Sequence, residues 1–239
     1  TEIYTLSLHD ALPIYNKTLT KNKLARFAEN KTFPHLFQPD FNELQSGFAL
    51  KGKWGEFFGN NHPIILELGC GKGEYTVALS SRYQHNNYIG VDIKGARIWR
   101  GALTSFQNGQ KNVAFLRMRI DSILNAFAPE EVSGIWITFP DPQPAKARKR
   151  LTSPMFLNRY AEILKPGSTI HLKTDNLPFF EYTLETIAAE GHHLLMHTFD
   201  LYNSNLNEDV MLTQTFYEKM FLAQGVPIKY LRFILKNHK

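Results

Sequence analysis

Glu67-Leu68-Gly69-Cys70-Gly71-Lys72-Gly73 joins a short apolar run to a segment with helical spacing. Residues 64–68 predict a buried strand, and residues 74–82 predict a helix. The glycines between them permit a tight turn and a close approach of a ligand, and the next helix offers free N–H groups. Dinucleotide-binding loops have the spacing G-x-G-x-x-G, whereas this loop has G-x-G-x-G after an acid. We therefore expect Glu67, Gly69, Gly71 and Gly73 to contact a nucleoside that carries a cationic amino acid, although an ordinary glycine turn is the alternative.

Strands and helices alternate through the rest of the chain. Further strands are expected at residues 88–92, 113–118, 134–139, 168–174, 194–201 and 228–235, and further helices at 96–106, 122–127, 154–164, 177–190 and 215–223. This alternation predicts an α/β fold with a mostly parallel, seven-stranded sheet and helices on both faces. Parallel sheets bind ligands beyond the carboxyl ends of their strands, so the residues after each strand are the candidates for a site.

Acidic residues follow the second and third of these strands. Asp92 comes about 20 residues after Gly73, where an acid can accept hydrogen bonds from both ribose hydroxyls. Asp121 follows the strand at residues 113–118 and could accept from an adenine amino group or cap the short helix after it. Cys70 has no base beside it in the sequence and is expected to be a small packed residue rather than a nucleophile.

The fourth strand leads into Phe139-Pro140-Asp141-Pro142-Gln143-Pro144, which is followed by the basic run Lys146–Arg150. Prolines on both sides stiffen the backbone around Asp141. A fixed carboxylate beside a cationic loop can place an acid against the edge of a base while the cations hold phosphates. The alternative is a proline-rich connection with a solvated basic flank.

Two later motifs carry similar chemistry. Asp175 lies in Lys173-Thr174-Asp175-Asn176, directly after the fifth strand. Near the end of the chain, Thr215-Phe216-Tyr217-Glu218 offers a hydroxyl, two aromatic rings and an acid, although a helix cap with an acidic first turn explains this motif nearly as well.

The charge distribution indicates a polyanionic partner. Lysine and arginine number 27 against 22 acids, and residues 93–120 contain six cations and no acid. Such basic blocks suit a nucleic acid, because phosphate contacts supply most of its affinity for proteins.

Several protein classes are excluded by composition. A single cysteine rules out an internal disulfide and a multi-cysteine zinc site, and the group His192, His193 and His197 matches no zinc-ligand spacing, so no metal is expected. No apolar stretch reaches the length of a transmembrane helix and no signal peptide is evident, so we expect a cytoplasmic protein with no membrane partner.

The chain divides into three parts by composition. Residues 1–15 resemble translated adapter read-through and are expected to be a non-native or disordered leader. Residues 16–60 form a basic amino-terminal arm, in which the cations between Lys17 and Arg26 are expected to contact phosphate. Residues 61–239 form the ligand-binding domain.

ELGCGKG, FPDPQP followed by RKRLT, LKTDN and TFYE, in this order and spacing, resemble the bacterial tRNA (guanine-N7)-methyltransferase family over roughly residues 17–239. The resemblance implies a Rossmann-like class I methyltransferase fold, S-adenosylmethionine as the methyl donor, and methylation of a guanosine in the variable loop of tRNA. It implies contacts with S-adenosylmethionine at Glu67, Asp92, Asp121 and Asp141, with Asp141 also catalytic.

The resemblance also implies substrate contacts, at Asp175, Thr215, Phe216, Tyr217 and Glu218. This chain departs from the family at Gln143, where many relatives have tryptophan, and at Ala145, where they have lysine. Lys146 is the nearest replacement for that substrate-binding lysine.

The alternatives are a methyltransferase on the same fold that acts on another RNA or a small molecule, and a non-catalytic tRNA-binding protein. A nicotinamide dehydrogenase fits less well because the glycine spacing differs. The sequence leaves open whether the protein is a monomer or a homodimer.

Overall fold

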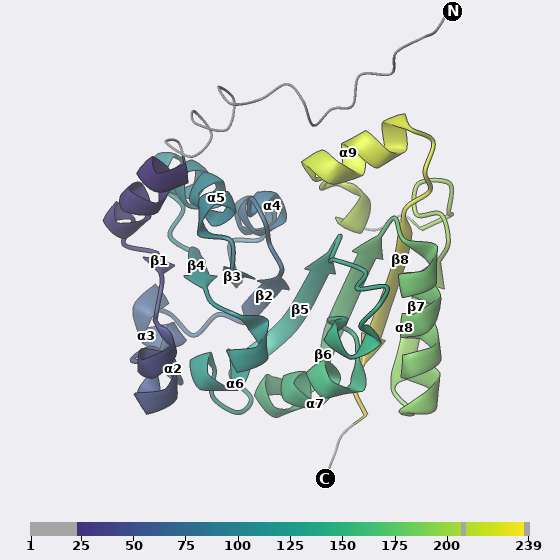
Figure 1. Cartoon of the computed structure of the whole chain (residues 1–239), viewed down its shortest axis with the longest axis horizontal. Helices are drawn as coiled ribbons and strands as arrows, with labels where there is room; N and C mark the ends of the chain where they lie inside the picture. Colours follow the sequence, from purple (N-terminus) through teal and green to yellow (C-terminus); the bar gives the residue numbers. More distant parts are fainter. Residues whose placement is uncertain (1–22, 207–208, 237–239) are drawn as a thin grey trace, which may run out of the picture.

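One eight-stranded sheet forms the centre of the computed structural model, which describes residues 23–206 and 209–236 (Figure 1). The strands are β1 (Leu36–Phe37), β2 (Ile64–Leu68), β3 (Asn87–Asp92), β4 (Val113–Arg117), β5 (Val132–Thr138), β6 (Leu164–Thr174), β7 (His193–Thr198) and β8 (Lys229–Ile234). Their order across the sheet is β1-β4-β3-β2-β5-β6-β8-β7. All neighbours are parallel except β8, which is antiparallel to both β6 and β7.

Helices cover both faces of the sheet. Those whose bounds lie within the described residues are α2 (Phe41–Gly47), α3 (Trp54–Phe58), α4 (Glu74–Arg82), α5 (Gly95–Gln107), α6 (Ile123–Ala126), α7 (Pro154–Ile163), α8 (Leu177–Ala189) and α9 (Phe216–Ala223). Alternate residues of each central strand enter different cores, because successive side chains of a strand point to opposite faces. On β2, for example, Leu66 and Leu68 pack with Trp54 of α3, whereas Ile65 packs with Tyr75 of α4. The predicted mostly parallel α/β fold is confirmed.

The structure corrects three predicted elements. The sheet has eight strands rather than seven, because Leu36–Phe37 in the predicted arm pairs in parallel with β4. Pro166-Gly167 was predicted to separate a helix from the following strand. Strand β6 instead begins at Leu164, and these two residues lie within it, where the pairing with β5 shifts register. Strand β7 ends at Thr198, three residues earlier than predicted.

Residues 23–37 of the predicted arm pack against α5 and β4, whereas α2 and α3 pack into the core on the other face of the sheet. Residues 23–29 are helical, and the Arg26 guanidinium lies 4.6 Å from the centre of the Trp99 ring. The Trp99 indole N–H donates to Glu29 at 2.6 Å, and the Asn30 side chain donates to the Gly95 carbonyl at 3.0 Å. The leader at residues 1–15 and the predicted phosphate contacts at Lys17 and Lys21 lie outside the described residues.

Strand order determines where a ligand can bind. Strand β2 has β3 on one side and β5 on the other, so the chain that leaves β2 runs to one half of the sheet and the chain that leaves β5 to the other. Open parallel sheets have their ligand crevice at such a reversal of strand order.

Within the described residues, no helix is long and apolar enough to cross a membrane.

Three glycines bring α4 and α5 close to the sheet at this point. The ring of Phe115 on β4 occupies the space that side chains would need at Gly73, Gly90 and Gly101. A Cβ atom at Gly73 would lie 2.5 Å from this ring, and the residue also has a φ of +68°. Gly73, the residue that precedes α4, therefore lies at a position where packing and backbone conformation both require glycine.

We predict that Gly73→Ala lowers the free energy of unfolding more than Gly109→Ala. Gly109 has a similar φ of +63°, and a Cβ atom there would have no neighbouring atom within 4 Å, so its substitution measures backbone strain alone, about 1–2 kcal/mol. The clash with Phe115 should cost Gly73→Ala a further 1–3 kcal/mol or so. Urea unfolding of both variants checks this, and equal losses would contradict it.

Candidate active site

A cleft of about 430 Å³ lies beyond the carboxyl ends of β2, β3, β4 and β5. Its walls come from the loops that follow these strands, from the basic segment after Asp141 and from α7. The lining residues are Gly69, Asp92, Ile93, Lys94, Arg97, Met118, Arg119, Ile120, Asp121, Phe139, Pro140, Asp141, Gln143, Lys146, Lys149, Leu151 and Phe156. A smaller hollow of about 70 Å³, lined by Glu67, Cys70, Thr138, Thr215 and Tyr217 among others, shares Gly69, Arg97 and Phe139 with it.

The glycine loop forms the floor between the two hollows. Gly69 and Gly71 have φ values of +76° and +56°, which only glycine adopts without strain. A Cβ atom at Gly69 would lie 3.8 Å from Leu151 on the opposite wall, so a side chain there would occupy the cleft. Cys70, between them, is buried, and burial raises the pKa of its thiol well above the usual value, as expected for a packed residue.

Asp92 is held in place by backbone groups at the end of β3. One carboxylate oxygen accepts from the Gly71 N–H at 2.9 Å and the other from the Lys94 N–H at 2.7 Å. Each oxygen keeps a further lone pair, because a carboxylate can accept about four hydrogen bonds. Asp92 therefore joins the glycine loop to the cleft and can accept from two adjacent hydroxyl groups.

Asp121 lies on the same wall as several apolar side chains. It makes an exposed ion pair with Arg119 at 3.3 Å. The helix-cap alternative for Asp121 is wrong, because Ser122 is the residue that precedes α6. Met118, Ile120, Leu151 and Phe156 complete a largely apolar region that suits a flat aromatic ring.

Asp141 stands on a strained loop. Phe139 and Gln143, two residues before and after it, have φ values of +48° and +46°, which are unfavourable for side-chain-bearing residues. The Gln143 N–H donates to the Asp141 carboxylate at 3.1 Å, and the Arg150 side chain donates to the Pro142 carbonyl at 3.0 Å. The loop thus presents an exposed carboxylate at a fixed place on the cleft wall.

Glu67 lies at the bottom of the smaller hollow, and only 4% of it is exposed. One oxygen accepts from the backbone N–H and the hydroxyl of Thr76, and the other accepts from the Thr138 hydroxyl at 2.7 Å. Burial raises the pKa of Glu67 to about 7, against the opposing effect of these hydrogen bonds. Glu67 can therefore gain or lose a proton near neutral pH.

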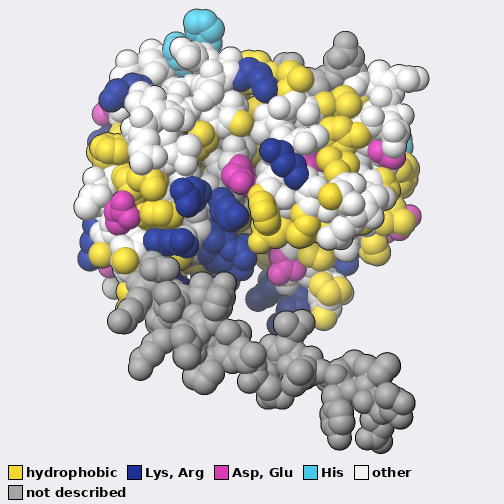
Figure 2. Space-filling view, turned by 90° about the horizontal axis from the view of Figure 1, so that it is seen from above, with side chains coloured by type: hydrophobic (Ala, Val, Ile, Leu, Met, Phe, Trp, Pro, Cys, Tyr) yellow, Lys and Arg dark blue, Asp and Glu magenta, His cyan; other side chains and the backbone are white. Residues whose placement is uncertain are grey.

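Cations surround the cleft. Lys94, Arg97, Arg119, Lys146 and Lys149 all line it. Figure 2 looks down on this edge of the sheet and shows Lys and Arg side chains close together near the middle of the face, with a few acidic side chains among them. The rim can therefore bind phosphate groups around a site whose inner surface carries carboxylates.

The structure brings most, but not all, of the predicted site residues to the cleft. Thr215 and Tyr217 line the smaller hollow. Asp175 is half-buried at the end of β6, where its carbonyl accepts from Lys229 at 2.9 Å. Phe216 is exposed beside the glycine loop: its N–H donates to Glu74 at 2.9 Å, and the Lys72 ammonium lies 4.3 Å from its ring.

The predicted substrate contact at Glu218 requires correction, because this side chain has no exposed surface. Its carboxylate forms an ion pair with Lys173 at 2.5 Å and accepts from the Tyr202 hydroxyl at 2.7 Å. Thr215 and Glu218 also form the capping box that begins α9, so the cap interpretation of this motif is confirmed. Gly73, which was also predicted to contact the ligand, packs against Phe115 behind the glycine loop.

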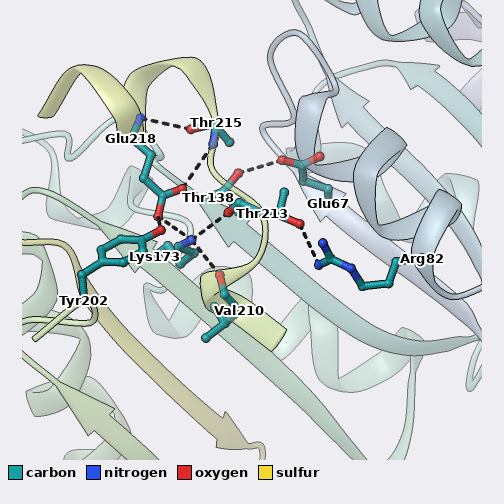
Figure 3. Close-up of polar contacts among 9 residues, drawn as sticks. All are labelled: Glu67, Arg82, Thr138, Lys173, Tyr202, Val210, Thr213, Thr215 and Glu218. Carbon is teal, nitrogen blue, oxygen red and sulfur yellow. Dashed lines mark hydrogen bonds and ion pairs between the residues drawn. The ribbon is translucent and has the colours of Figure 1, made fainter. Parts of the chain in front are cut away.

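Two residues of this site were missed from the sequence. Thr138 holds Glu67, and Lys173 holds Glu218 (Figure 3). A signal for Lys173 exists, since a lysine in the apolar run Ile170-His171-Leu172-Lys173 of a central strand must be exposed or paired. Its partner lies 45 positions later in the sequence, where no local pattern reveals it.

The strand order, glycine loop and strand-end acids together define a class I methyltransferase. A family model described as "Putative methyltransferase" matches residues 61–231. Among solved structures, a crystal structure of a 16S rRNA methyltransferase has a TM-score of 0.60 at 14% identity and covers 77% of this chain and 94% of that one. This likeness shows a shared fold.

Closer relatives are found by sequence. The tRNA (guanine-N(7)-)-methyltransferase of Bacteroides thetaiotaomicron is 51% identical over 217 residues, which cover 90% of this chain and 86% of that protein. The protein of the same name from Christiangramia forsetii is 50% identical over 222 residues, or 91% of this chain and 99% of that one. The chain belongs to the tRNA (guanine-N7)-methyltransferase family.

S-adenosylmethionine is the methyl donor of this family, and the cleft fits it. Gly69 has no side chain, and a Cβ atom there would meet only Leu151, at 3.8 Å, so a ligand can approach the backbone of the loop. Asp92 can hold the ribose hydroxyls, the apolar wall at Ile120 and Phe156 can hold the adenine, and Glu67 can face the cationic amino-acid end.

We predict that affinity for S-adenosylhomocysteine, which keeps the ammonium group, rises with pH between about 6 and 8. A cation bound beside Glu67 favours the ionised carboxylate, so below the pKa of about 7 binding must first remove a proton, and affinity should fall by up to about tenfold per pH unit. Calorimetry in buffers of different ionisation enthalpy should detect this proton release.

Two variants complete the test. Glu67→Gln should weaken binding and flatten the pH profile, because the titrating group is gone. Asp121→Asn removes an exposed carboxylate from the same cleft and should keep the pH dependence. A pH-independent affinity in the unmodified protein would contradict the role given to Glu67.

Proposed function

We propose that this protein transfers the methyl group of S-adenosylmethionine to N7 of a guanine in tRNA. The observation that carries the proposal is the position of Asp141. This carboxylate projects from a strained loop into a nucleoside-sized cleft, with Lys146 and Lys149 on the same wall. Membership of the tRNA (guanine-N7)-methyltransferase family supports both the reaction and the polyanionic substrate.

The methyl transfer itself does not require the protein to move a proton. S-adenosylmethionine supplies an activated methyl group on a sulfonium, and guanine N7 has an in-plane lone pair and carries no proton. No general base is therefore required. The residues of the cleft act by holding the base in line with the methyl group and by keeping the extruded base out of the helical stack.

Asp141 and Asp175 are the residues we propose for guanine selection. They follow neighbouring strands whose ends are joined, because the Phe139 N–H donates to the Lys173 carbonyl at 2.9 Å. Each carboxylate can accept from the N1–H or the N2 amine of guanine, which leaves the N7 edge free. Adenine has no proton at N1 and would leave a carboxylate without a partner, a loss that disfavours it.

We predict that Asp141→Asn and Asp175→Asn each lower kcat/KM for tRNA by about 10- to 100-fold, the cost of losing a hydrogen bond to a charged group. Glu185→Gln, an exposed acid on α8, is the matched control and should leave the rate unchanged. The measurement uses labelled S-adenosylmethionine and unmodified tRNA, followed by digestion and identification of the methylated nucleoside.

The same experiment tests the reaction itself. The proposal requires 7-methylguanosine as the product, and mapping its position tests the expected site in the variable loop. Label in another nucleoside, transfer to small molecules but not to tRNA, or binding of tRNA without any transfer would overturn it. Near-normal rates for both aspartate variants would instead refute only the pose of the base.

The basic rim is proposed to bind tRNA phosphates. Lys146 and Lys149 are exposed, line the cleft and follow Asp141 closely in the chain. Arg26 of the described arm lies over the Trp99 ring of α5, which holds this cation in a fixed position on the surface of the protein. A cytoplasmic location is expected with tRNA as the partner.

We predict that Lys146→Gln combined with Lys149→Gln weakens tRNA binding and reduces the slope of log affinity against log salt concentration by about 1–2, because two phosphate contacts are lost. Lys165→Gln, at the opposite end of the sheet, should change neither quantity. Filter binding at several salt concentrations measures both, and an unchanged slope in the double variant would contradict the phosphate role.

A further inference from the structure

We propose that Lys173 is a positioning residue for methyl transfer, which sets the separation between the Asp141 loop and the segment that carries Thr215 and Tyr217. This inference rests on the proposed function, because these two parts form the walls between which the guanine would lie. Lys173 itself has no exposed surface and does not touch the substrate.

The side chain of Lys173 holds one wall (Figure 3). Its ammonium group pairs with the Glu218 carboxylate at 2.5 Å and donates to the carbonyls of Val210 and Thr213 at 3.1 and 3.3 Å. An ammonium has three N–H groups, so these acceptors can satisfy all of them. One buried cation thus fixes the start of α9 and the chain that leads into it.

Glu218 passes this constraint to the cleft. Its second oxygen accepts from the Thr215 N–H at 3.2 Å, and the Thr215 hydroxyl accepts from the Glu218 N–H at 3.2 Å. Thr215 and Tyr217 line the hollow above Glu67. A shift of the Glu218 carboxylate would therefore move both of these residues relative to the methyl donor.

The backbone of Lys173 holds the other wall. Its carbonyl accepts from the Phe139 N–H at 2.9 Å, and Phe139 is the strained residue from which the Asp141 loop begins. The Phe139 ring also stacks on Phe221 of α9, with ring centres 6.1 Å apart. Lys173 is thus in direct contact with both walls, through its carbonyl on one side and its ammonium on the other.

Stability alone does not account for a lysine here. A buried ion pair is costly to desolvate, and replacing both partners with apolar residues of similar size is often neutral or stabilising. The burial of Lys173 lowers the pKa of its ammonium, while the Glu218 carboxylate raises it again. Hydrogen bonds have a preferred direction, which apolar contacts lack. Those of this pair therefore fix β6, the chain at residues 210–213 and the start of α9 in one arrangement.

The test compares Lys173→Met, the double variant Lys173→Met/Glu218→Met, and Ile187→Ala. Ile187 is buried on α8, away from the cleft, and its truncation destabilises the fold without touching either wall. For each variant we would measure the urea midpoint of unfolding, the affinity for S-adenosylhomocysteine, and kcat and KM with unmodified tRNA.

We expect Lys173→Met to lower both the urea midpoint and kcat, the latter by about 100-fold, the loss typical of a misplaced reacting geometry. Affinity for S-adenosylhomocysteine and KM should change by about threefold at most. The double variant no longer buries an unpaired charge, so its urea midpoint should recover part of the loss, short of the full value because the capping box and the Tyr202 hydrogen bond are gone, while kcat stays low. Ile187→Ala should lose stability and keep kcat.

Recovery of kcat together with stability in the double variant would overturn the inference, since it would show that the pair only stabilises the fold. An unchanged kcat in Lys173→Met would overturn it as well. These failures differ from failure of the proposed function, in which the unmodified protein itself would form no 7-methylguanosine in tRNA.

Discussion

The reversal of strand order at β2 is the constraint on which the site depends. Because β3 and β5 flank β2 on opposite sides, the loops that follow these three strands diverge and leave a cleft between them. The glycine loop, Asp92 and Asp141 each belong to one of those loops. The strand order therefore brings these three parts together, and the local sequence determines only which side chains they carry. Phe115 of β4 adds to this arrangement, because the glycines around its ring let α4 and α5 lie close to β3 and β4.

Charge is distributed by depth in this site. Exposed cations on the rim can attract a polyanion, while the exposed carboxylate of Asp141 lies on the cleft wall among them. Beneath the surface, Glu67 is buried with its hydrogen bonds supplied by Thr76 and Thr138. The Lys173–Glu218 pair lies deeper still, without solvent contact. The outer charges suit binding and recognition, and the inner ones suit a fixed geometry.

Much of this site follows from local sequence patterns. A strand that ends in Glu67 and a glycine turn, an acid at the end of the next strand, and prolines around Asp141 are readable because each depends on a few neighbouring residues. The buried groups are not readable in this way. The partners of Lys173 come from residues 210–218, and the exclusion of Glu218 from the cleft depends on those contacts. The two-residue strand β1 was missed for the same reason, since its pairing with β4 and not its own composition makes it a strand.

The most direct measurement of the central claim is a crystal structure of the protein with S-adenosylhomocysteine. If the reversal at β2 creates the donor site, the adenosine will lie against Asp92 and the apolar wall at Ile120, with the amino-acid end toward Glu67 and the sulfur facing the space between Asp141 and Thr215. A ligand bound elsewhere on the sheet, or one whose ribose has no contact with Asp92, would contradict the account.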